Sequence, residues 1–478
     1  MTCITANVTA KTPRLVYFGV FLWAFLAAYL SLFPNIRLFL PFLVFTTIIL
    51  LLIPFRVSFS VLVVFALAHT PGYGNIFQFR FAGWNILLLE VITIFIFLQI
   101  IIESLVGRIR FRITPMLIVI GMFFLSSVIQ LLRGIYLGYD PSQLRSAGRA
   151  IVYFSYIIPI AAYYASGGTP RKLINLMLIG WGFALIHYFM KYFGIIFPAG
   201  ASGTARMIWP PISNVIWFLP LILMYALIKG VRQYDRKTYL CWFLLVVSCL
   251  VLLPTQARSI YLALFVEFVL LLSVVIAIQK KGERVVFVFR LLVITVVGVA
   301  LAYFLLKFLM GEKFDLLISN VMLRFRTLGS IRRDLPIASR IYQIYESIKL
   351  LKGHWVFGRG LGIEWHSLIN TGYFRIDNLY FTILVNQGLI GLGLYFAILA
   401  LWMQRGIYLV NNSRLIKDNI VLAFSLVQPL AVLSILVSGM AGPAYYLSTP
   451  NIILMLLWAM TTEVIYSKVR PVKMEHLN

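Results

Sequence analysis

Residues 353–396 read GHWVFGRGLGIEWHSLINTGYFRIDNLYFTILVNQGLIGLGLYF. The first part of this stretch is basic, aromatic and rich in glycine, and the last part is apolar enough to form a membrane helix. The 478-residue chain around it is 62% hydrophobic and only 12% charged, yet its formal net charge is +26. This combination predicts an integral membrane protein with an unusual excess of positive charge.

Apolar stretches long enough to cross a bilayer as helices recur along the whole chain. A span needs about 20 such residues, and on this criterion we expect an all-α, polytopic transmembrane bundle of about 12–14 helices. The expected spans lie near 15–33, 36–54, 57–70, 84–103, 113–135, 149–165, 172–196, 208–228, 238–254, 259–279, 285–309, 378–402, 419–439 and 450–467. The pattern divides the chain into transmembrane helices over 1–309 (about eleven), one large outer loop over 310–377, and C-terminal transmembrane helices (about three) with a cytoplasmic tail over 378–478.

The distribution of Lys and Arg predicts an orientation. Roughly half of the 41 basic residues fall in alternating short loops, such as 108–112 and 280–284. The positive-inside rule places these loops in the cytoplasm, together with both termini. The remaining basic residues lie on the opposite face, where few are expected; they include Arg80, Arg133, Arg145, Arg149, Arg206, Arg258 and Arg340. A single one of them could contact lipid headgroups, but the set indicates binding of an anionic substrate.

Metal and nucleotide chemistry have little support in the sequence. The three cysteines and five histidines are scattered, with no pair at metal-ligand spacing. Gly358-Arg-Gly-Leu-Gly362 is not set between a strand and a nucleotide-fold helix, so a tight turn or a close backbone approach to a substrate is the better interpretation. We therefore expect no metal, no cofactor and no nucleic-acid partner.

The large loop contains one clear helical pattern, over residues 339–352. Its apolar residues recur every three or four positions, which predicts an amphipathic helix on the membrane surface, with Ser339 as N-cap and Gly353 as stop. Arg340 opens this helix and is either a solvated residue or, with Arg359, part of a cationic cluster that stabilises a pyrophosphate leaving group.

Other candidate residues each have a structural and a functional interpretation. Arg258, at the end of a span, either anchors the helix or binds phosphate oxygens with its guanidinium. Asp377 is either the N-cap of the next helix or a general base that takes a proton from a sugar hydroxyl. Glu364 and His366 compete for the base role, and Arg375 would lower the pKa of Asp377 if the two paired.

The glycines at 388, 391 and 393 fit close helix packing in lipid, which is a structural role.

Four segments follow one another in an order that resembles the O-antigen ligase and Wzy-type polymerase superfamily, the membrane glycosyltransferases that build bacterial surface polysaccharides. They are TQARSIYLAL (255–264), SRIYQIYESIKLL (339–351), GHWVFGRGLG (353–362) and DNLYFTILVNQGLIGLGLYF (377–396). The resemblance covers roughly residues 240–400; the first half of the chain is similar in hydropathy alone.

The resemblance implies a GT-C-like membrane fold and an undecaprenyl-pyrophosphate-linked oligosaccharide as donor. Transfer would occur at the periplasmic face of the bacterial inner membrane, with a chain-length regulator as a further partner besides membrane lipid. The candidate catalytic residues are Asp377, His366, Glu364, Arg258 and Arg340. The candidate pyrophosphate- or glycan-binding residues are Arg258, Arg340, Arg359, Arg375, Asn378, Arg145, Arg149 and Arg206.

Departures from the family pattern favour a polymerase. Asp377 stands where ligases typically carry His, and Ala257 and Ile260 replace the usual Ser and Gly around Arg258. We therefore expect a metal-independent, inverting glycosyltransferase that joins repeat units into O-antigen, exopolysaccharide or capsule. One alternative is a ligase that transfers glycan to lipid A-core in lipopolysaccharide. The other is a flippase of the same lipid-linked sugars, which would predict two related halves that the sequence lacks.

Overall fold

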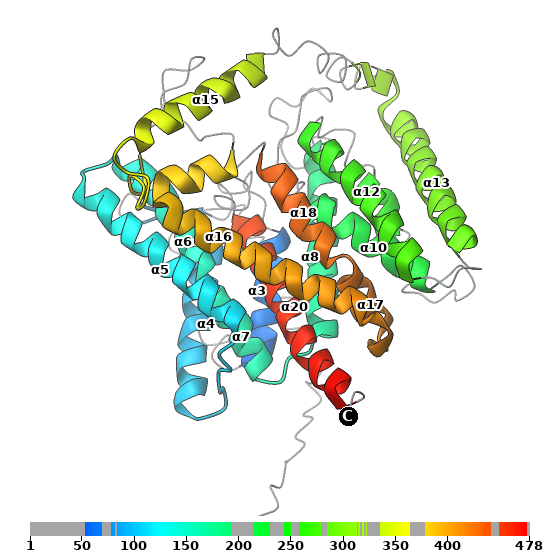
Figure 1. The fold of residues 1–478 in the computed structure, drawn as a ribbon, viewed down its shortest axis with the longest axis horizontal. Helices are drawn as coiled ribbons and strands as arrows, with labels where there is room; N and C mark the ends of the chain where they lie inside the picture. Colours follow the sequence, from blue (N-terminus) through cyan, green and yellow to red (C-terminus); the bar gives the residue numbers. More distant parts are fainter. Residues whose placement is uncertain are drawn as a thin grey trace, which may run out of the picture. The chain divides into compact units, whose positions relative to one another are not determined.

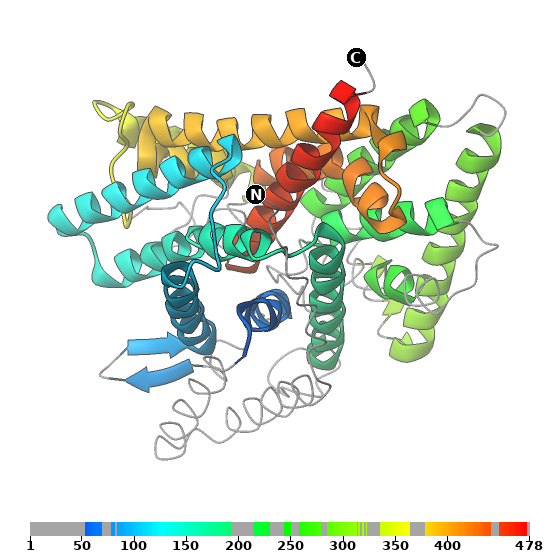
Figure 2. The same cartoon turned by 90° about the horizontal axis from the view of Figure 1, so that it is seen from below.

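The computed structural model describes residues 53–68, 78–81, 84–192, 214–229, 243–249, 258–278, 284–312, 335–363, 378–440 and 449–475, with five further positions between 314 and 322. The chain forms two compact units, one of 1–62 with 72–109 and one of 63–71 with 110–478. Figure 1 shows the ribbon, and Figure 2 the same ribbon from below.

In unit 1, helices flank a small hairpin. Strands β1 (Gln78–Phe81) and β2 (Trp84–Leu87) pair antiparallel, and β2 leads directly into α4 (Leu88–Leu105). The first half of α3 (Phe55–Ala68) belongs to this unit, and Gln99 Nε2 of α4 donates a hydrogen bond to Ile53 O at 3.1 Å. The hairpin is the one β element among the described residues and is a small addition to the expected all-α fold.

Unit 2 is a helical bundle. Its helices are α5 (Pro115–Tyr136), α6 (Pro141–Phe154), α7 (Ile157–Ala165), α8 (Pro170–Tyr192), α10 (Val215–Lys229), α12 (Arg258–Ile278), α13 (Arg284–Met310), α15 (Leu335–Leu351), α16 (Leu379–Asn411), α17 (Asn419–Leu426), α18 (Gln428–Gly439) and α20 (Thr449–Glu475), with the 3-10 turn η4 (Ser413–Leu415). The helix starts follow local rules: Thr114 caps α5 and Asp140 caps α6, each followed by a proline at the first helical position.

The polytopic helical bundle expected from the sequence is confirmed. Among the described residues, four helices are long and apolar enough to cross a membrane: Pro115–Tyr136, Leu379–Asn411, Asn419–Gly439 and Asn451–Arg470. Shorter apolar helices lie at Phe55–Ala68, Val215–Ile228, Ile260–Val274 and Thr295–Leu305. The first expected span and nearly all of the second lie outside the described residues, so the number of spans stays a prediction.

Two expected spans are each divided into two helices. The span near 149–165 contains the end of α6 and all of α7, separated at Ser155–Tyr156. The span near 419–439 is α17 followed by α18, and Pro429 in the first turn of α18 marks the division. Hydropathy does not detect such breaks, because both pieces remain apolar.

Helix α16 lies at the centre of unit 2 and packs against α5, α15, α17, α18 and α20 (Figure 1). Three fully buried tryptophans fill the core around it: the ring of Trp217 lies 5.8 Å from Trp402 and 5.3 Å from Trp458, centroid to centroid. Helix α13, by contrast, packs mainly against α12 and exposes apolar residues along its length. Such a surface is suited to lipid contact.

Candidate functional site

The centre of the candidate site is a break in α16. Gly388 has φ 68° and ψ −166°, a conformation that is essentially restricted to glycine. In a continuous helix, the N–H groups of Leu389 and Ile390 would donate to the carbonyls of Val385 and Asn386. The break separates these partners, and unpaired backbone groups are costly in an apolar bundle.

The segment 353–363, which we call the docked turn, supplies all four missing partners. Leu389 N donates to Trp355 O at 2.8 Å, and Ile390 N donates to Val356 O at 3.3 Å. In return, Arg359 N donates to Val385 O at 2.7 Å, and Gly360 N donates to Asn386 O at 3.1 Å. The docked turn therefore completes the hydrogen bonding of a membrane helix 30 residues further along the chain.

Glycines allow the backbones to approach this closely. A Cβ on Gly388 would lie 2.2 Å from Val356 O, and one on Gly358 would lie 2.6 Å from Gly388 N. The other side of the docked turn meets α5, where Leu361 N donates to Gln130 O at 3.0 Å and a Cβ on Gly134 would lie 2.0 Å from Leu361 O. The docked turn is thus held between α5 and α16.

This geometry tests two sequence interpretations. The tight turn expected at 358–362 is confirmed, since Gly358, Gly360 and Gly362 all have positive φ. Helix packing was the wrong explanation for Gly388 and Gly393. Gly388 breaks the helix and meets the docked turn, whereas a Cβ on Gly393 would meet nothing within 4 Å.

A buried polar network joins α5 to α16 beside the break. The Gln387 side chain, which is fully buried, accepts a hydrogen bond from Ser126 Oγ at 3.1 Å and donates one to Ser127 Oγ at 2.9 Å. Because buried amides are expensive to leave unpaired, this network favours one position of α16 relative to α5.

Cationic side chains gather where the docked turn meets the end of α5. Arg133 Nη1 donates to Gly358 O at 2.9 Å, and Arg359 Nε donates to Leu350 O at 2.8 Å. The hydroxyl of Tyr139 donates to Arg359 O at 2.9 Å. We call Arg133, Tyr139, His354 and Arg359 the turn cluster.

The electrostatics of the turn cluster reflect both arginines. The pKa of His354 is lowered below its ordinary value, chiefly by partial burial and further by the positive charges of Arg359 and Arg133. Burial raises the pKa of Tyr139, and the same two arginines oppose that rise. The cluster is therefore a region of positive potential in which His354 is more easily kept neutral.

Arg340 lies at the opposite end of α15 from Arg359. Its Nε is buried and has no hydrogen-bond partner among the described residues. Gln343 and Ser347, both buried, follow at helical spacing on the same face of α15.

Helix α15 begins at Leu335, so Ser339 lies within the helix and the expectation that it is the N-cap was wrong. Gly353 follows the end of α15 with φ 78°, as a helix stop requires.

The start of α6 adjoins the docked turn. A Cβ on Gly362 would lie 2.8 Å from the Leu144 side chain, next to Arg145. Arg145 is exposed and Arg149, one turn further along α6, is half-buried. The structure thus places the start of α6, which carries Arg145, against the docked turn, which carries Arg359.

Asn378, not Asp377, is the N-cap of α16, so the capping interpretation of Asp377 was wrong. Asn378 Oδ1 accepts from Tyr380 N at 3.0 Å and from Phe381 N at 3.1 Å, and its Nδ2 donates to Met440 O at 3.3 Å.

Five other candidates lie outside the described residues: Arg206, Glu364, His366, Arg375 and Asp377. Arg258 begins α12, but its side chain is not described.

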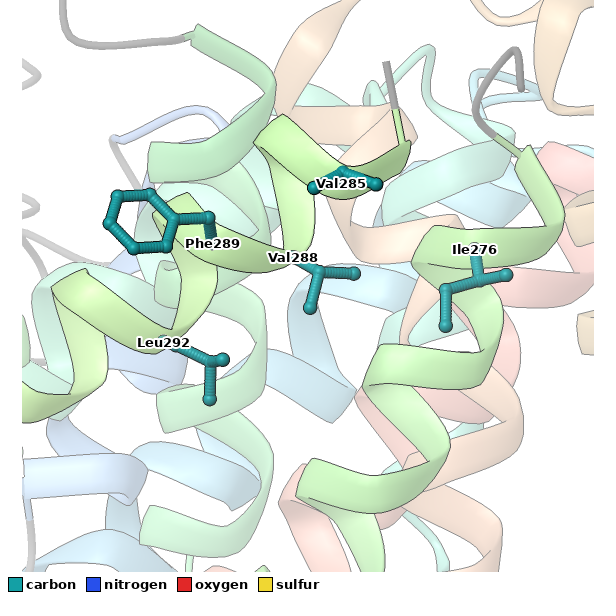
Figure 3. A pocket seen from close by; sticks show the side chains of 5 residues that line it. All are labelled: Ile276, Val285, Val288, Phe289 and Leu292. Atoms are coloured by element: carbon teal, nitrogen blue, oxygen red, sulfur yellow. The ribbon is translucent and has the colours of Figure 1, made fainter. Parts of the chain in front are cut away.

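Other features of the described residues offer little chemistry. No group of three or more His, Cys, Asp or Glu that could hold a metal ion occurs in this part of the chain. An open apolar hollow of about 430 Å³ lies between α12 and α13. It is lined by Ile276, Val285, Val288, Phe289 and Leu292 (Figure 3). None of these side chains can bind an anion or transfer a proton, so the hollow suits lipid chains.

The comparisons agree with the sequence resemblance. Residues 243–396 match the family model described as O-Antigen ligase, and this segment includes α12, α13, α15, the docked turn and the broken part of α16. The match covers about a third of the chain and supports the resemblance to the O-antigen ligase and Wzy superfamily over this segment. No curated protein matches the chain.

Proposed function

We propose that this protein is a metal-independent, inverting glycosyltransferase that polymerises undecaprenyl-pyrophosphate-linked oligosaccharide repeat units. It would act on the periplasmic side of the bacterial inner membrane, with both termini in the cytoplasm, and produce O-antigen, exopolysaccharide or capsule. The observation that carries the proposal is the docked turn. Within the segment matched by the O-Antigen ligase model, it fixes the backbone of Arg359 against a broken membrane helix, next to the Gly358 carbonyl that Arg133 binds.

The proposed reaction needs an acid–base residue and an anion-stabilising set. A hydroxyl of the acceptor sugar attacks the anomeric carbon, the bond from that carbon to the pyrophosphate oxygen breaks, and the configuration inverts. Asp377, Glu364 or His366 takes the hydroxyl proton, and Arg258 and Arg340 stabilise the leaving pyrophosphate. Fixed guanidinium charges suit this task because they do not deprotonate and bind phosphate oxygens in pairs.

A second candidate is the ligase reaction, which the description of the matched family model favours. Both reactions use the same donor and the same leaving group, and they differ in the acceptor: a lipid-linked glycan for the polymerase and lipid A-core for the ligase. In either case the lipid-linked oligosaccharide and membrane lipid are partners. A chain-length regulator is an expected partner of the polymerase.

The test is the size distribution of surface polysaccharide and of lipid-linked glycan in a deletion strain complemented with wild-type protein, Arg258→Ala, Arg340→Ala or Arg414→Ala. Arg414 is an exposed arginine away from the site and serves as the control. Losing one charge-assisted hydrogen bond of about 1.5–3 kcal/mol is expected to reduce polymer formation about 10- to 100-fold.

The products distinguish the candidates. Single repeat units left on lipid, or capping lipid A-core, support the polymerase. Full-length polymer stranded on the polyprenyl carrier supports the ligase. Undiminished polymer in both Arg258→Ala and Arg340→Ala contradicts the proposed chemistry, and substrate trapped on the cytoplasmic leaflet indicates a flippase.

A further inference from the structure

The turn cluster contains two guanidinium groups that use few of their donors in contacts with the described residues. Toward the described residues, Arg133 and Arg359 each make one side-chain hydrogen bond, to Gly358 O and Leu350 O respectively. A guanidinium carries five N–H donors. The ion pairs among the described residues are Arg171–Asp418, Lys349–Glu346 and Arg405–Glu463, and none of them includes Arg133 or Arg359.

The two charges act on a common space. Arg359 and Arg133 both lie close enough to affect the pKa of His354, in the docked turn, and that of Tyr139, just beyond the end of α5. Like charges held near each other without a counter-charge repel. The backbone hydrogen bonds that fix the docked turn hold Arg359 in this position, so the repulsion is relieved best by a bound anion.

This anion is not a pyrophosphate held at Arg340. Arg359 Nε donates a hydrogen bond to Leu350 O. Leu350 lies ten residues beyond Arg340 on α15, so the backbones of these two residues are about 15 Å apart along the helix axis. Side chains on a helix lean toward its N-terminus, which directs Arg340 further away. One pyrophosphate cannot bridge this separation.

We propose that Arg133 and Arg359 form a second oxyanion-binding site, separate from Arg340, for a phosphate or carboxylate group of the lipid-linked glycan substrates. The proposal rests on the proposed function for the origin of the anion. The site pairs an α5 residue, outside the segment matched by the family model, with a residue of the docked turn. Two substrates that each carry an anionic group require two such sites.

The direct test is anion binding to the purified full-length protein in lipid nanodiscs. Inorganic pyrophosphate and glucuronate are titrated separately against a variant that carries both Arg258→Gln and Arg340→Gln, and so lacks both arginines of the first site. The same titrations are repeated with Arg133→Gln added to that variant. The matched control adds Arg110→Gln instead, because Arg110 is an exposed arginine in the connection between α4 and α5. Binding of at least one probe is expected, with its Kd raised at least tenfold by Arg133→Gln and unchanged by Arg110→Gln.

The probe identifies the source of the anion. A Kd that rises for pyrophosphate alone assigns the site to a carrier phosphate, and one that rises for glucuronate alone assigns it to an acidic sugar. The proposal is overturned if neither probe binds, if Arg133→Gln leaves both affinities unchanged, or if Arg110→Gln weakens binding equally.

A second measurement needs no substitution. Phenylglyoxal modifies accessible arginines, and mass spectrometry locates the modified positions. In the wild-type protein, whichever of pyrophosphate and glucuronate binds in the titrations should protect both Arg133 and Arg359 from modification. Failure to protect them contradicts the proposal. Neither measurement involves glycan transfer, so a polymerase without protection at Arg133 would refute this site while leaving the proposed function intact.

Discussion

At the scale of single residues, the conformation of Gly388 decides how the site is assembled. Any residue with a side chain would have to adopt a strained backbone there and would place its Cβ 2.2 Å from Val356 O. The four hydrogen bonds between the docked turn and α16 all depend on this break. A helix without the break would reclaim its own hydrogen bonds and leave the docked turn without partners.

Gly388→Ala should therefore destabilise the protein by about 3 kcal/mol or more, from the strained backbone and the steric clash together. The measurement is the thermal unfolding midpoint in detergent. Gly393→Ala is the matched control: Gly393 lies in the same helix with free space around it, and alanine there should stabilise by about 0.5–1 kcal/mol. Equal midpoints for the two variants would show that the break is not required.

His354 gives the turn cluster a pH dependence. Its pKa is lowered in the folded protein, chiefly by burial and then by Arg359 and Arg133, so the unfolded chain binds the proton more readily. The stability due to neutral His354 is fully present above the ordinary value of about 6.5 and is lost as pH falls below it. Between pH 7 and pH 5, the unfolding midpoint should fall more in the wild-type protein than in His354→Gln. Parallel pH curves would exclude this role.

At the scale of elements, α15 has two distinct faces. Ile341, Tyr345 and Ile348 are 61%, 64% and 46% exposed, whereas Gln343 and Ser347 are buried against the protein. The sequence predicted an amphipathic helix here, and its apolar stripe is the exposed one. Such a helix is expected to lie in the membrane interface, with its apolar face among the acyl chains.

Spin labelling tests the position of α15. In a background with Cys3, Cys241 and Cys249 replaced by serine, a label at Tyr345→Cys should be relaxed more by oxygen than by a polar nickel complex. The references are Arg414→Cys for a water-exposed position and Val296→Cys for a lipid-facing one. A Tyr345→Cys label as accessible to nickel as that at Arg414→Cys would place α15 in water.

The same elements show what a sequence can predict. Long apolar helices such as α5 and α13 were placed within a few residues, because lipid requires continuous apolar stretches of known length. The break in α16 could not be predicted, since its hydrogen-bond partners lie 30 residues earlier in the chain. Arg133 and Tyr139 were missed as site residues for the same reason: they reach the docked turn through the fold. The one available signal was an arginine, Arg133, on the face where few are expected.

At the scale of the whole of unit 2, α16 also connects to the C-terminal helix through a buried ion pair. Arg405 Nε donates to Glu463 Oε2 at 3.1 Å, with the side chains 12% and 5% exposed. The Arg405 guanidinium lies 4.0 Å from the centroid of the Tyr466 ring. Beside this pair, Gln428 Oε1 accepts from Trp402 Nε1 at 2.8 Å, so α16, α18 and α20 share one polar contact region.

Removing one member of this pair should cost far more than removing both. Arg405→Ala leaves Glu463 buried and unpaired, which should destabilise the protein by about 3–5 kcal/mol, whereas Arg405→Met combined with Glu463→Leu should recover most of the loss. Unfolding in detergent measures both. Arg171→Ala, which removes an exposed pair with Asp418, is the control and should cost about 1 kcal/mol or less. If the double variant is as unstable as Arg405→Ala, packing of these side chains, and not their charge, joins α16 to α20.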